Sequence, residues 1–309
     1  MFNGLHYNSI ATTLKEQFGV RIVKISLDGG FTCPNRDGKV GFGGCSFCTG
    51  DGAGEFASSN LDSIKAQIEK QKSKWPDECK YIAYFQAFSN TYAPVDVLKS
   101  KWFEALSFEN VVGIAIATRP DCLSKDVLNL LDELNKKTFL WVELGLQTSN
   151  EETAKQFNRC YDNSVFEEAM TNLSNLGIKT VIHMILGLPG ESNEDMINTG
   201  KYVASFNPFG IKIHMLNVLN GSRLGDEYIK TPENKRMHLL SKEEYIQIVC
   251  DILEIMPPSV TIHRLTGDGP KDKLIGPSWV LDKHAVLNDI QKEFSRRGTY
   301  QGYNLSQNI

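Results

Sequence analysis

Three cysteines in one glycine-rich segment are the residues whose type and spacing point most directly to chemistry. Cys33, Cys45 and Cys48 follow the spacing C-x11-C-x2-C, and three glycines of the segment 41–44 lie between the first two. Thiolates are soft ligands that suit iron–sulfur clusters or zinc. Glycines let the backbone fold tightly around such a group. The spacing therefore predicts a metal centre held by these three thiolates.

A structural zinc site is the main alternative for this segment, and such a site needs four protein ligands. No fourth cysteine or histidine lies nearby in the sequence, since the next cysteine is Cys79. Three thiolates leave one iron of a [4Fe–4S] cluster open to a chelating ligand, so a cluster is the preferred interpretation. The remaining cysteines are scattered and are expected to be reduced core or surface thiols: Cys79, Cys122, Cys160 and Cys250.

The composition is that of an ordinary globular enzyme. The chain has 309 residues, of which 41% are hydrophobic and 23% are charged, and its seven cysteines are too few and too unevenly spaced for a disulfide framework. The first residues lack the basic and apolar regions of a signal peptide, and no apolar run approaches a membrane span. We therefore expect a cytoplasmic protein with no membrane contact. The net charge of −4 argues against a generic nucleic-acid binder, although it leaves room for a local basic face.

The elements that must position the cysteines form a regular alternation of short β-branched runs and amphipathic segments. Helices are expected between the strands, including 163–176, and later at 241–256 and 283–296. A capping box is expected at Ser192 with Asp195 and at Ser241 with Glu244. The expected strands are Ile22–Leu27, Tyr81–Phe88, Val111–Thr118, Phe139–Gln147, Ile178–Gly187 and Ile211–Leu219.

Six βα units in series imply a parallel sheet with right-handed crossovers. Six is short of the eight strands that close a full barrel, so we predict an α/β fold, a partial (β/α)6 barrel, with an open doubly wound sheet as the alternative. In either fold the ends of the strands and the loops after them build the active site. We divide the chain into 1–225, the barrel with its lead-in, and 226–309, an α/β extension packed on the barrel that includes a short strand at 260–265.

The cysteine segment resembles that of radical S-adenosylmethionine (SAM) enzymes. Their usual signature is C-x3-C-x-aromatic-C, and here Phe47 keeps the aromatic place before the last cysteine while the first gap is widened. The widened loop resembles the YhcC/YtqA-like (MnmL-type) branch, which is related to the radical SAM domain of the Elongator catalytic subunit. The resemblance implies a TIM-like barrel, a [4Fe–4S] cluster and SAM, which the reduced cluster cleaves to a 5′-deoxyadenosyl radical.

The end of the second strand binds the methionine part of SAM in radical SAM enzymes, often through a glycine-rich turn. Here that turn has no glycine, and the polar candidates are Gln86, Ser89 and Asn90. An N-cap loop for the following helix is the alternative for the residues from Ser89 to Thr91.

The fourth and fifth strands carry further candidates for the SAM site. Gly145, Gln147 and Arg159 resemble the G-x-Q…R pattern of oxygen-independent coproporphyrinogen oxidases, whose glutamine and arginine contact SAM. By the two-residue period of a strand, Glu143 lies on the same face as Gln147, and polar residues on an inward face are costly unless paired. A structural salt bridge is the alternative for Arg159. His183 precedes a G-L-P-G-E turn that resembles the adenine-binding strand, and a core histidine is its alternative.

The implied substrate is tRNA. By resemblance to Elongator and the MnmL-type branch, the enzyme is expected to convert a carboxymethylaminomethyl side chain of the wobble uridine to aminomethyl, with flavodoxin or ferredoxin as electron donor. The alternatives are a small metabolite or a porphyrin-like substrate, and a non-enzymatic metal-binding scaffold. For tRNA we expect basic and aromatic residues around the barrel mouth. The candidates are Lys39, Arg264, Arg296, Arg297, Tyr300 and Tyr303.

Overall fold

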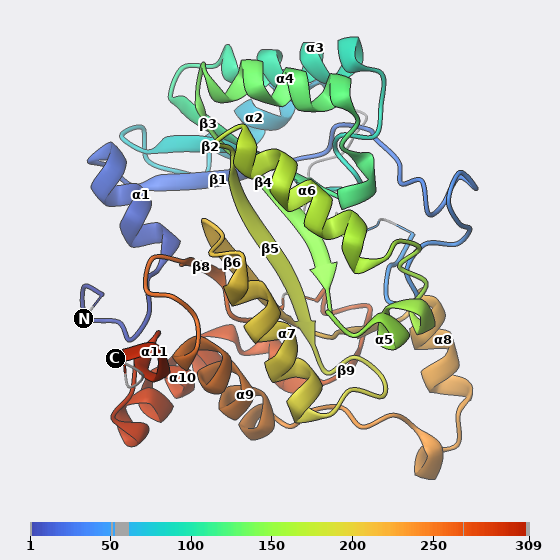
Figure 1. Ribbon diagram of the computed structural model, residues 1–309. Coiled ribbons are helices and arrows are strands. Elements are labelled where there is room, and N and C mark those ends of the chain that lie inside the picture. Colours follow the sequence, from blue (N-terminus) through green and yellow to red (C-terminus); the bar gives the residue numbers. More distant parts are fainter. Residues whose placement is uncertain (1, 51, 53–61, 268, 307–309) are drawn as a thin grey trace.

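The chain forms a curled parallel sheet covered by helices on its outer face (Figure 1). The computed structural model describes residues 2–50, 52, 62–267 and 269–306. Seven strands lie in the order β1-β2-β3-β4-β5-β6-β8, and every neighbouring pair is parallel. The predicted partial TIM-like barrel is therefore confirmed, with one strand more than the six expected.

The strands are β1 (Ile22–Leu27), β2 (Lys80–Phe85), β3 (Val111–Thr118), β4 (Phe139–Gln147), β5 (Lys179–Leu186), β6 (Gly210–Met215), β7 (Val218–Leu219), β8 (Thr261–Arg264) and β9 (Leu274–Gly276). The α-helices are α1 (Ile10–Phe18), α2 (Ile64–Lys72), α3 (Val95–Leu106), α4 (Lys125–Asn135), α5 (Glu151–Gln156), α6 (Asn163–Asn175), α7 (Asn193–Ser205), α8 (Arg223–Lys230), α9 (Lys242–Glu254), α10 (Lys283–Arg297) and α11 (Tyr303–Ser306). Short 3-10 helices occupy Pro120–Cys122, Glu233–Lys235 and Ser278–Leu281.

Local sequence signals fix many of these boundaries. Both expected capping boxes are present: the Ser192 and Ser241 side chains accept from the backbone N–H three residues later, and Asp195 and Glu244 accept from the N-cap N–H in return. Ser124 caps α4 in the simpler way, through the N–H of Val127. Each cap satisfies backbone donors that a helix start leaves unpaired.

The sixth predicted strand, Ile211–Leu219, is interrupted in the structure. After β6 the backbone turns so that Leu216 N–H donates to the Leu186 carbonyl at 2.9 Å, and β7 then pairs antiparallel with β9. Asn217 is the one polar residue between β6 and β7, which is too weak a signal in the sequence to predict the break. The strand at the start of the C-terminal part, β8, joins the sheet beside β6 and adds the seventh parallel strand.

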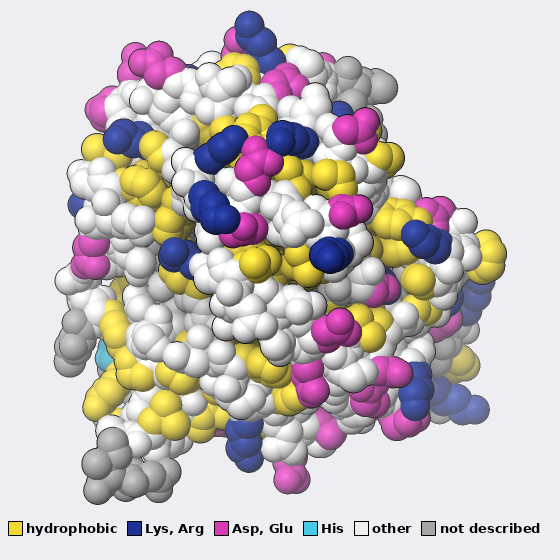
Figure 2. Space-filling view, turned by 45° about the horizontal axis from the view of Figure 1, so that its top comes forward, with side chains coloured by type: hydrophobic (Ala, Val, Ile, Leu, Met, Phe, Trp, Pro, Cys, Tyr) yellow, Lys and Arg dark blue, Asp and Glu magenta, His cyan; other side chains and the backbone are white. Residues whose placement is uncertain are grey.

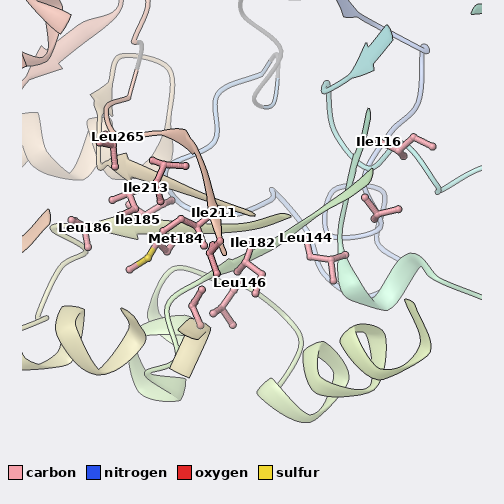
Figure 3. Packing of buried hydrophobic residues seen from close by; sticks show 14 of the residues in the cluster. Ile116, Leu144, Leu146, Ile182, Met184, Ile185, Leu186, Ile211, Ile213 and Leu265 are labelled. Carbon is pink, nitrogen blue, oxygen red and sulfur yellow. The ribbon is translucent and has the colours of Figure 1, made fainter. Parts of the chain in front are cut away.

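Two apolar layers hold the sheet in place. The outward side chains of the strands pack against the helices, and Figure 3 shows this packing around Leu144, Leu146, Ile182 and Met184. The inward side chains at the base of the barrel form a second, smaller cluster with Trp141 at its centre. Its buried members are Ile82, Tyr84, Ala115, Ala117, Trp141 and Val181. This cluster fills the base of the barrel, so the functional space lies above it, toward the strand ends.

The two ends of the barrel differ in what surrounds them. In Figure 1 the arrowheads of β4 and β5 point toward α5 and α8, whereas α11 and both chain ends lie at the opposite side. Gln301 donates to the carbonyls of Pro257 and Val260, just before β8 begins, which places the C-terminal tail near the starts of the strands. Within the described residues no helix is long and apolar enough to cross a membrane.

Candidate active site

The cysteine loop follows β1 and is fastened to the loop after β4. Asn35 donates its side-chain amide to the carbonyl of Asn158 at 2.6 Å, and Asn158 donates to the carbonyl of Gly44 at 2.9 Å. Ser46 N–H donates to the carbonyl of Phe157 at 2.9 Å. These reciprocal bonds set the cysteine loop against the end of the fourth strand, where other candidate residues lie.

The three predicted cluster ligands lie together at one cavity. Cys33, Cys45 and Cys48 are free thiols that line one cavity. A single zinc ion draws its sulfurs to about 2.3 Å from the metal, and no group of three or more His, Cys, Asp or Glu among the described residues is close enough together to hold one ion. Asn35 also places its amide 3.8 Å from Cys45 Sγ, a contact that suits a thiolate ligand.

The cavity gathers most of the predicted site residues. It has a volume of about 350 Å³, within the range of small-molecule sites. Seven of the eight residues predicted to bind the cofactor line it together with the three cysteines. They are Phe47, Gln86, Ser89, Glu143, Gln147, Arg159 and His183.

Asn90 is the predicted site residue that the cavity does not include. It is fully buried, and both its backbone N–H and its side-chain amide donate to the carbonyl of Ala117 at 3.1 and 2.9 Å. Its role is to join the loop after β2 to β3. Ser89 and Gln86 do reach the cavity, so they remain the polar groups that this loop offers to a ligand.

Gln147 is held in an uncommon conformation at the end of β4. Its φ of 71° lies in the left-handed region, which non-glycine residues rarely adopt. Among the described residues no hydrogen-bond partner is found for its side-chain amide, which lines the cavity. Such local strain is typical of functional sites, and an amide without a protein partner is available to a ligand.

Arg159 lines the same cavity but uses its guanidinium within the protein. It is 1% exposed and donates to the backbone carbonyls of Leu146, Thr148 and Tyr161 at 2.9 to 3.2 Å. It also pairs with the side chains of Glu151 and Asn163. The observed contacts therefore agree with the structural alternative: Arg159 shapes the loop after β4.

Glu143 lies deeper in the barrel, on the inward face of β4, and its carboxylate is saturated by protein donors. Oε2 accepts from Tyr84 Oη and His183 Nε2, both at 2.8 Å, and from Lys212 Nζ, while Oε1 accepts from Trp141 Nε1 at 2.8 Å. Burial alone would raise the pKa of Glu143, but the charges and hydrogen bonds of its partners hold it well below its usual range. The carboxylate is therefore ionised.

Sequence reasoning missed Lys212 and Tyr84, which complete this buried network. Lys212 Nζ donates to Tyr84 Oη at 2.8 Å, and burial, opposed by Glu143, lowers the pKa of Lys212 to about 7. The signal was available, since Lys212 and His214 stand two apart in a short apolar strand and so face the same way. Arg36 and Arg119 also line the cavity without having been predicted.

The predicted basic rim is only partly correct. Arg264 lines the cavity, and Lys39 lies on the cysteine loop with Nζ 5.3 Å from the centre of the Tyr92 ring. Arg296 and Arg297 do not line it. They lie at the end of α10, on the side of the starts of the strands, and both pair with Glu293. Arg297 also pairs with Asp251 and Glu254, while Tyr300 and Tyr303, packed edge-to-face, share that end of the molecule.

Comparison with known families decides the chemistry of this site. Residues 33–203 match the Radical SAM superfamily, a match that starts at Cys33 and covers more than half of the chain, and residues 208–296 match the Radical SAM C-terminal domain. This chain belongs to the radical SAM superfamily. As a radical SAM enzyme it uses a [4Fe–4S] cluster and SAM, and the donor set of three thiols around one cavity fits that cluster.

The similar proteins agree with the predicted branch. The chain is 48% identical over 300 residues to YtqA of Bacillus subtilis, covering 96% of this chain and 92% of YtqA. It is 32% identical to YhcC of Escherichia coli K12, with 94% and 93% covered. Elongator complex protein 3 of Mus musculus is 28% identical over 53% of this chain and 29% of that protein. The solved structure of Methanocaldococcus infernus Elp3 lacking residues 1–46 superposes with a TM-score of 0.66 at 19% identity, covering 91% of this chain and 64% of that one.

The first prediction concerns Gln147 as a SAM contact. We expect Gln147→Ala to weaken SAM binding by about tenfold to hundredfold, because a hydrogen bond to a charged group contributes about 1.5–3 kcal/mol. Anaerobic calorimetry with the cluster-loaded protein measures this. Gln17→Ala, at an exposed position of α1, serves as the matched control. Unchanged SAM affinity in a folded Gln147→Ala protein removes Gln147 from the site.

Proposed function

We propose that this radical SAM enzyme modifies the wobble uridine of tRNA, converting a carboxymethylaminomethyl side chain to an aminomethyl side chain. The observation that supports an RNA substrate best is the widened cysteine loop, which carries an exposed aromatic ring and one cation, Arg36, that lines the cavity. Phe42 is 76% exposed on this loop, and Arg36 and Gly44, on either side of it in the sequence, line the cavity. Unpaired RNA bases stack on exposed aromatic rings. The similarity to Elongator complex protein 3 supports the same substrate class.

In this reaction different residues of the chain would have different roles. The cluster and SAM supply, when bound, the 5′-deoxyadenosyl radical that takes a hydrogen atom from the substrate. Gln86, Ser89 and Gln147 offer polar groups to SAM at the strand ends. Arg159 and Asn158 keep the loops that frame the cavity in place. The buried base of the barrel excludes water from beneath the reacting groups.

Radical SAM chemistry also needs an electron donor, and we assign this part to a flavodoxin or a ferredoxin in the cytoplasm. The face drawn in Figure 2 carries basic and acidic side chains interspersed with one another. Ion pairs such as Lys99–Glu133 and Lys137–Glu133 join side chains of this kind on α3, on α4 and just after α4. A mixed surface suits neither an RNA backbone nor an acidic partner particularly well, so RNA contact is expected at the cavity mouth.

A small carboxylate metabolite is the second candidate substrate, because the deepest part of the cavity is buried and lined with charged groups. Lys212 and Glu143 there are only 3% and 1% exposed. Nucleoside mass spectrometry of tRNA from a deletion strain separates the two candidates. Accumulation of carboxymethylaminomethyluridine supports the tRNA function, whereas unchanged wobble side chains contradict it and favour the metabolite.

The second prediction tests the aromatic ring on the cysteine loop. We expect Phe42→Ala to weaken tRNA binding by about fivefold to hundredfold, since base–aromatic stacking contributes about 1–3 kcal/mol per base. Fluorescence anisotropy with a labelled anticodon stem-loop measures the affinity. Tyr300→Ala is the matched control, because Tyr300 is 42% exposed but lies at the far end of the barrel. Equal loss in both variants, or no loss in Phe42→Ala, contradicts a stacking role for this loop.

A further inference from the structure

The floor of the cavity carries a group of cationic and hydrogen-bond-donating side chains that the proposed chemistry does not yet use. We call Lys212, His214 and Arg264 the floor donors. All three line the cavity, and Lys212 and Arg264 are Cα partners across the neighbouring strands β6 and β8. His183 is the Cα partner of Lys212 on the other side, so charged and polar groups run across three adjacent strands at one level.

The carboxylate on this floor is already used by the protein. Both oxygens of Glu143 accept hydrogen bonds, one from Trp141 and the other from three groups including Lys212. No other Asp or Glu among the described residues lines the cavity. A ligand that reaches the floor therefore meets an ionised carboxylate whose acceptor sites are occupied, and it must find its partners among the donors.

Two of the floor donors, Lys212 and His214, retain hydrogen-bonding capacity for such a ligand. An ammonium group has three N–H donors, and Lys212 uses two of them, on Glu143 and Tyr84. The Nε2 atom of His214 is buried and has no hydrogen-bond partner among the described residues, a costly state unless a ligand or water completes it. Arg264 adds positive charge, and its field lowers the pKa of both Lys212 and His214 after the larger effect of burial.

A glycine leaves room at the same level. Gly145 is the Cα partner of His183 on the neighbouring strand β4, and it lines the cavity. A Cβ built there would come within 2.8 Å of the Gln147 amide. The absence of a side chain at Gly145 therefore leaves this space to the Gln147 amide, between the end of β4 and the floor.

We propose that the floor donors bind a carboxylate group of the substrate. The buried floor admits a small terminal group, and donors and cations around a satisfied Glu143 select an anion with acceptor oxygens. In the tRNA reaction that group is the carboxylate at the tip of the carboxymethylaminomethyl side chain, so the identity of the molecule that carries it rests on the proposed function. Binding the tip here places the carbon chain of the substrate between the floor and the cysteine loop.

Matched RNA ligands test this assignment. Three anticodon stem-loops carry, at the wobble position, the carboxymethylaminomethyl group, the corresponding neutral amide, or the aminomethyl group. With the cluster- and SAM-loaded enzyme we expect the carboxylate RNA to bind about tenfold to hundredfold more tightly than the amide RNA, the effect of a hydrogen-bonded charge. The affinities of the free nucleosides that carry the carboxylate and the amide are compared in the same way. A carboxylate preference seen only with these nucleosides indicates a small-molecule substrate.

Two variants test whether the floor donors cause the preference for the carboxylate over the amide ligand. His214→Leu removes the unpartnered donor without breaking an ion pair, and the double variant Lys212→Met with Glu143→Gln removes the cation without leaving a buried charge unpaired. Both are expected to reduce the carboxylate-to-amide ratio toward one. His284→Leu is the matched control, because His284 is exposed on α10, outside the cavity, and should retain the ratio.

The outcomes separate this inference from the tRNA function. A carboxylate preference with RNA that is lost in His214→Leu supports both proposals. A preference seen only with free nucleosides, and lost in the same variant, supports the floor site and contradicts the tRNA substrate. Equal affinity for carboxylate and amide ligands in the wild-type enzyme, or a preference that His214→Leu and the double variant leave intact, overturns the assignment of the floor donors.

Discussion

Replacing Cys33, Cys45 or Cys48 with alanine is expected to remove the cluster and abolish SAM cleavage. The wild-type protein, purified without oxygen, should contain about four irons and four sulfides per chain, as a three-thiolate [4Fe–4S] cluster requires. Each variant loses one of the three thiols around the cavity, and among the described residues no other cysteine lines it. Iron and sulfide analysis, the visible spectrum and the yield of 5′-deoxyadenosine measure the effect.

The other thiols of the chain supply the controls for this prediction. Cys160 is the sharpest of them, because it is exposed yet close to the cysteine loop: a Cβ on Gly41 would lie 2.8 Å from its Sγ. Cys160→Ala should keep the brown chromophore, and so should replacements of the buried Cys79, Cys122 and Cys250. Stoichiometric zinc without iron after anaerobic reconstitution would falsify the cluster assignment.

Strands β1, β3 and β4 begin and end at the expected residues. β3 is a nearly continuous apolar run, as is typical of a parallel strand that is buried on both faces. β1 alternates apolar with polar residues and is buried mainly on one face, and this two-residue period also predicts a strand. The break between β6 and β7 could not be predicted, since Met215 and Leu216 continue the apolar run through it. The place of β8 in the sheet depends on pairing with β6, which is distant in the sequence.

Some residues of the candidate site could likewise be placed from the sequence, and others could not. The cysteines lie in the loop after β1 and Gln147 is the last residue of β4, so their place at the strand ends could be predicted from the local sequence. The strand period could have placed Lys212 beside His214 on one face of β6, but its partners Tyr84 and Glu143 come from two other strands and are seen only in the fold. The arginines of the tail were misplaced for the opposite reason. The positive charge of these residues did not indicate at which end of the barrel they lie. In the structure the acidic partners of Arg297 are on α9 and α10.

Arg159→Ala is expected to lower the free energy of unfolding by about 3 kcal/mol or more, because it removes several hydrogen bonds between a buried guanidinium and neutral acceptors, each worth about 1.5–3 kcal/mol. The variant leaves the carbonyls of Leu146 and Thr148 without their charged donor, and buried acceptors that lose a partner are expensive. Urea denaturation followed by circular dichroism measures the change. Arg223→Ala is the matched control: the Arg223 side chain is 49% exposed and its Nε lies 3.9 Å from Oε1 of Glu227, so its loss should change stability by about 0.5 kcal/mol or less.

The same variant distinguishes the two interpretations of Arg159. The loop that it holds continues into Asn158 and Phe157, whose carbonyls bind the cysteine loop through Asn35 and Ser46. If Arg159 acts through this framework, Arg159→Ala should lose cluster content together with stability, and Arg159→Lys should recover little, because a lysine cannot reproduce the forked donors of a guanidinium. A variant that keeps its stability and its four irons but binds SAM tenfold more weakly would instead make Arg159 a direct ligand contact.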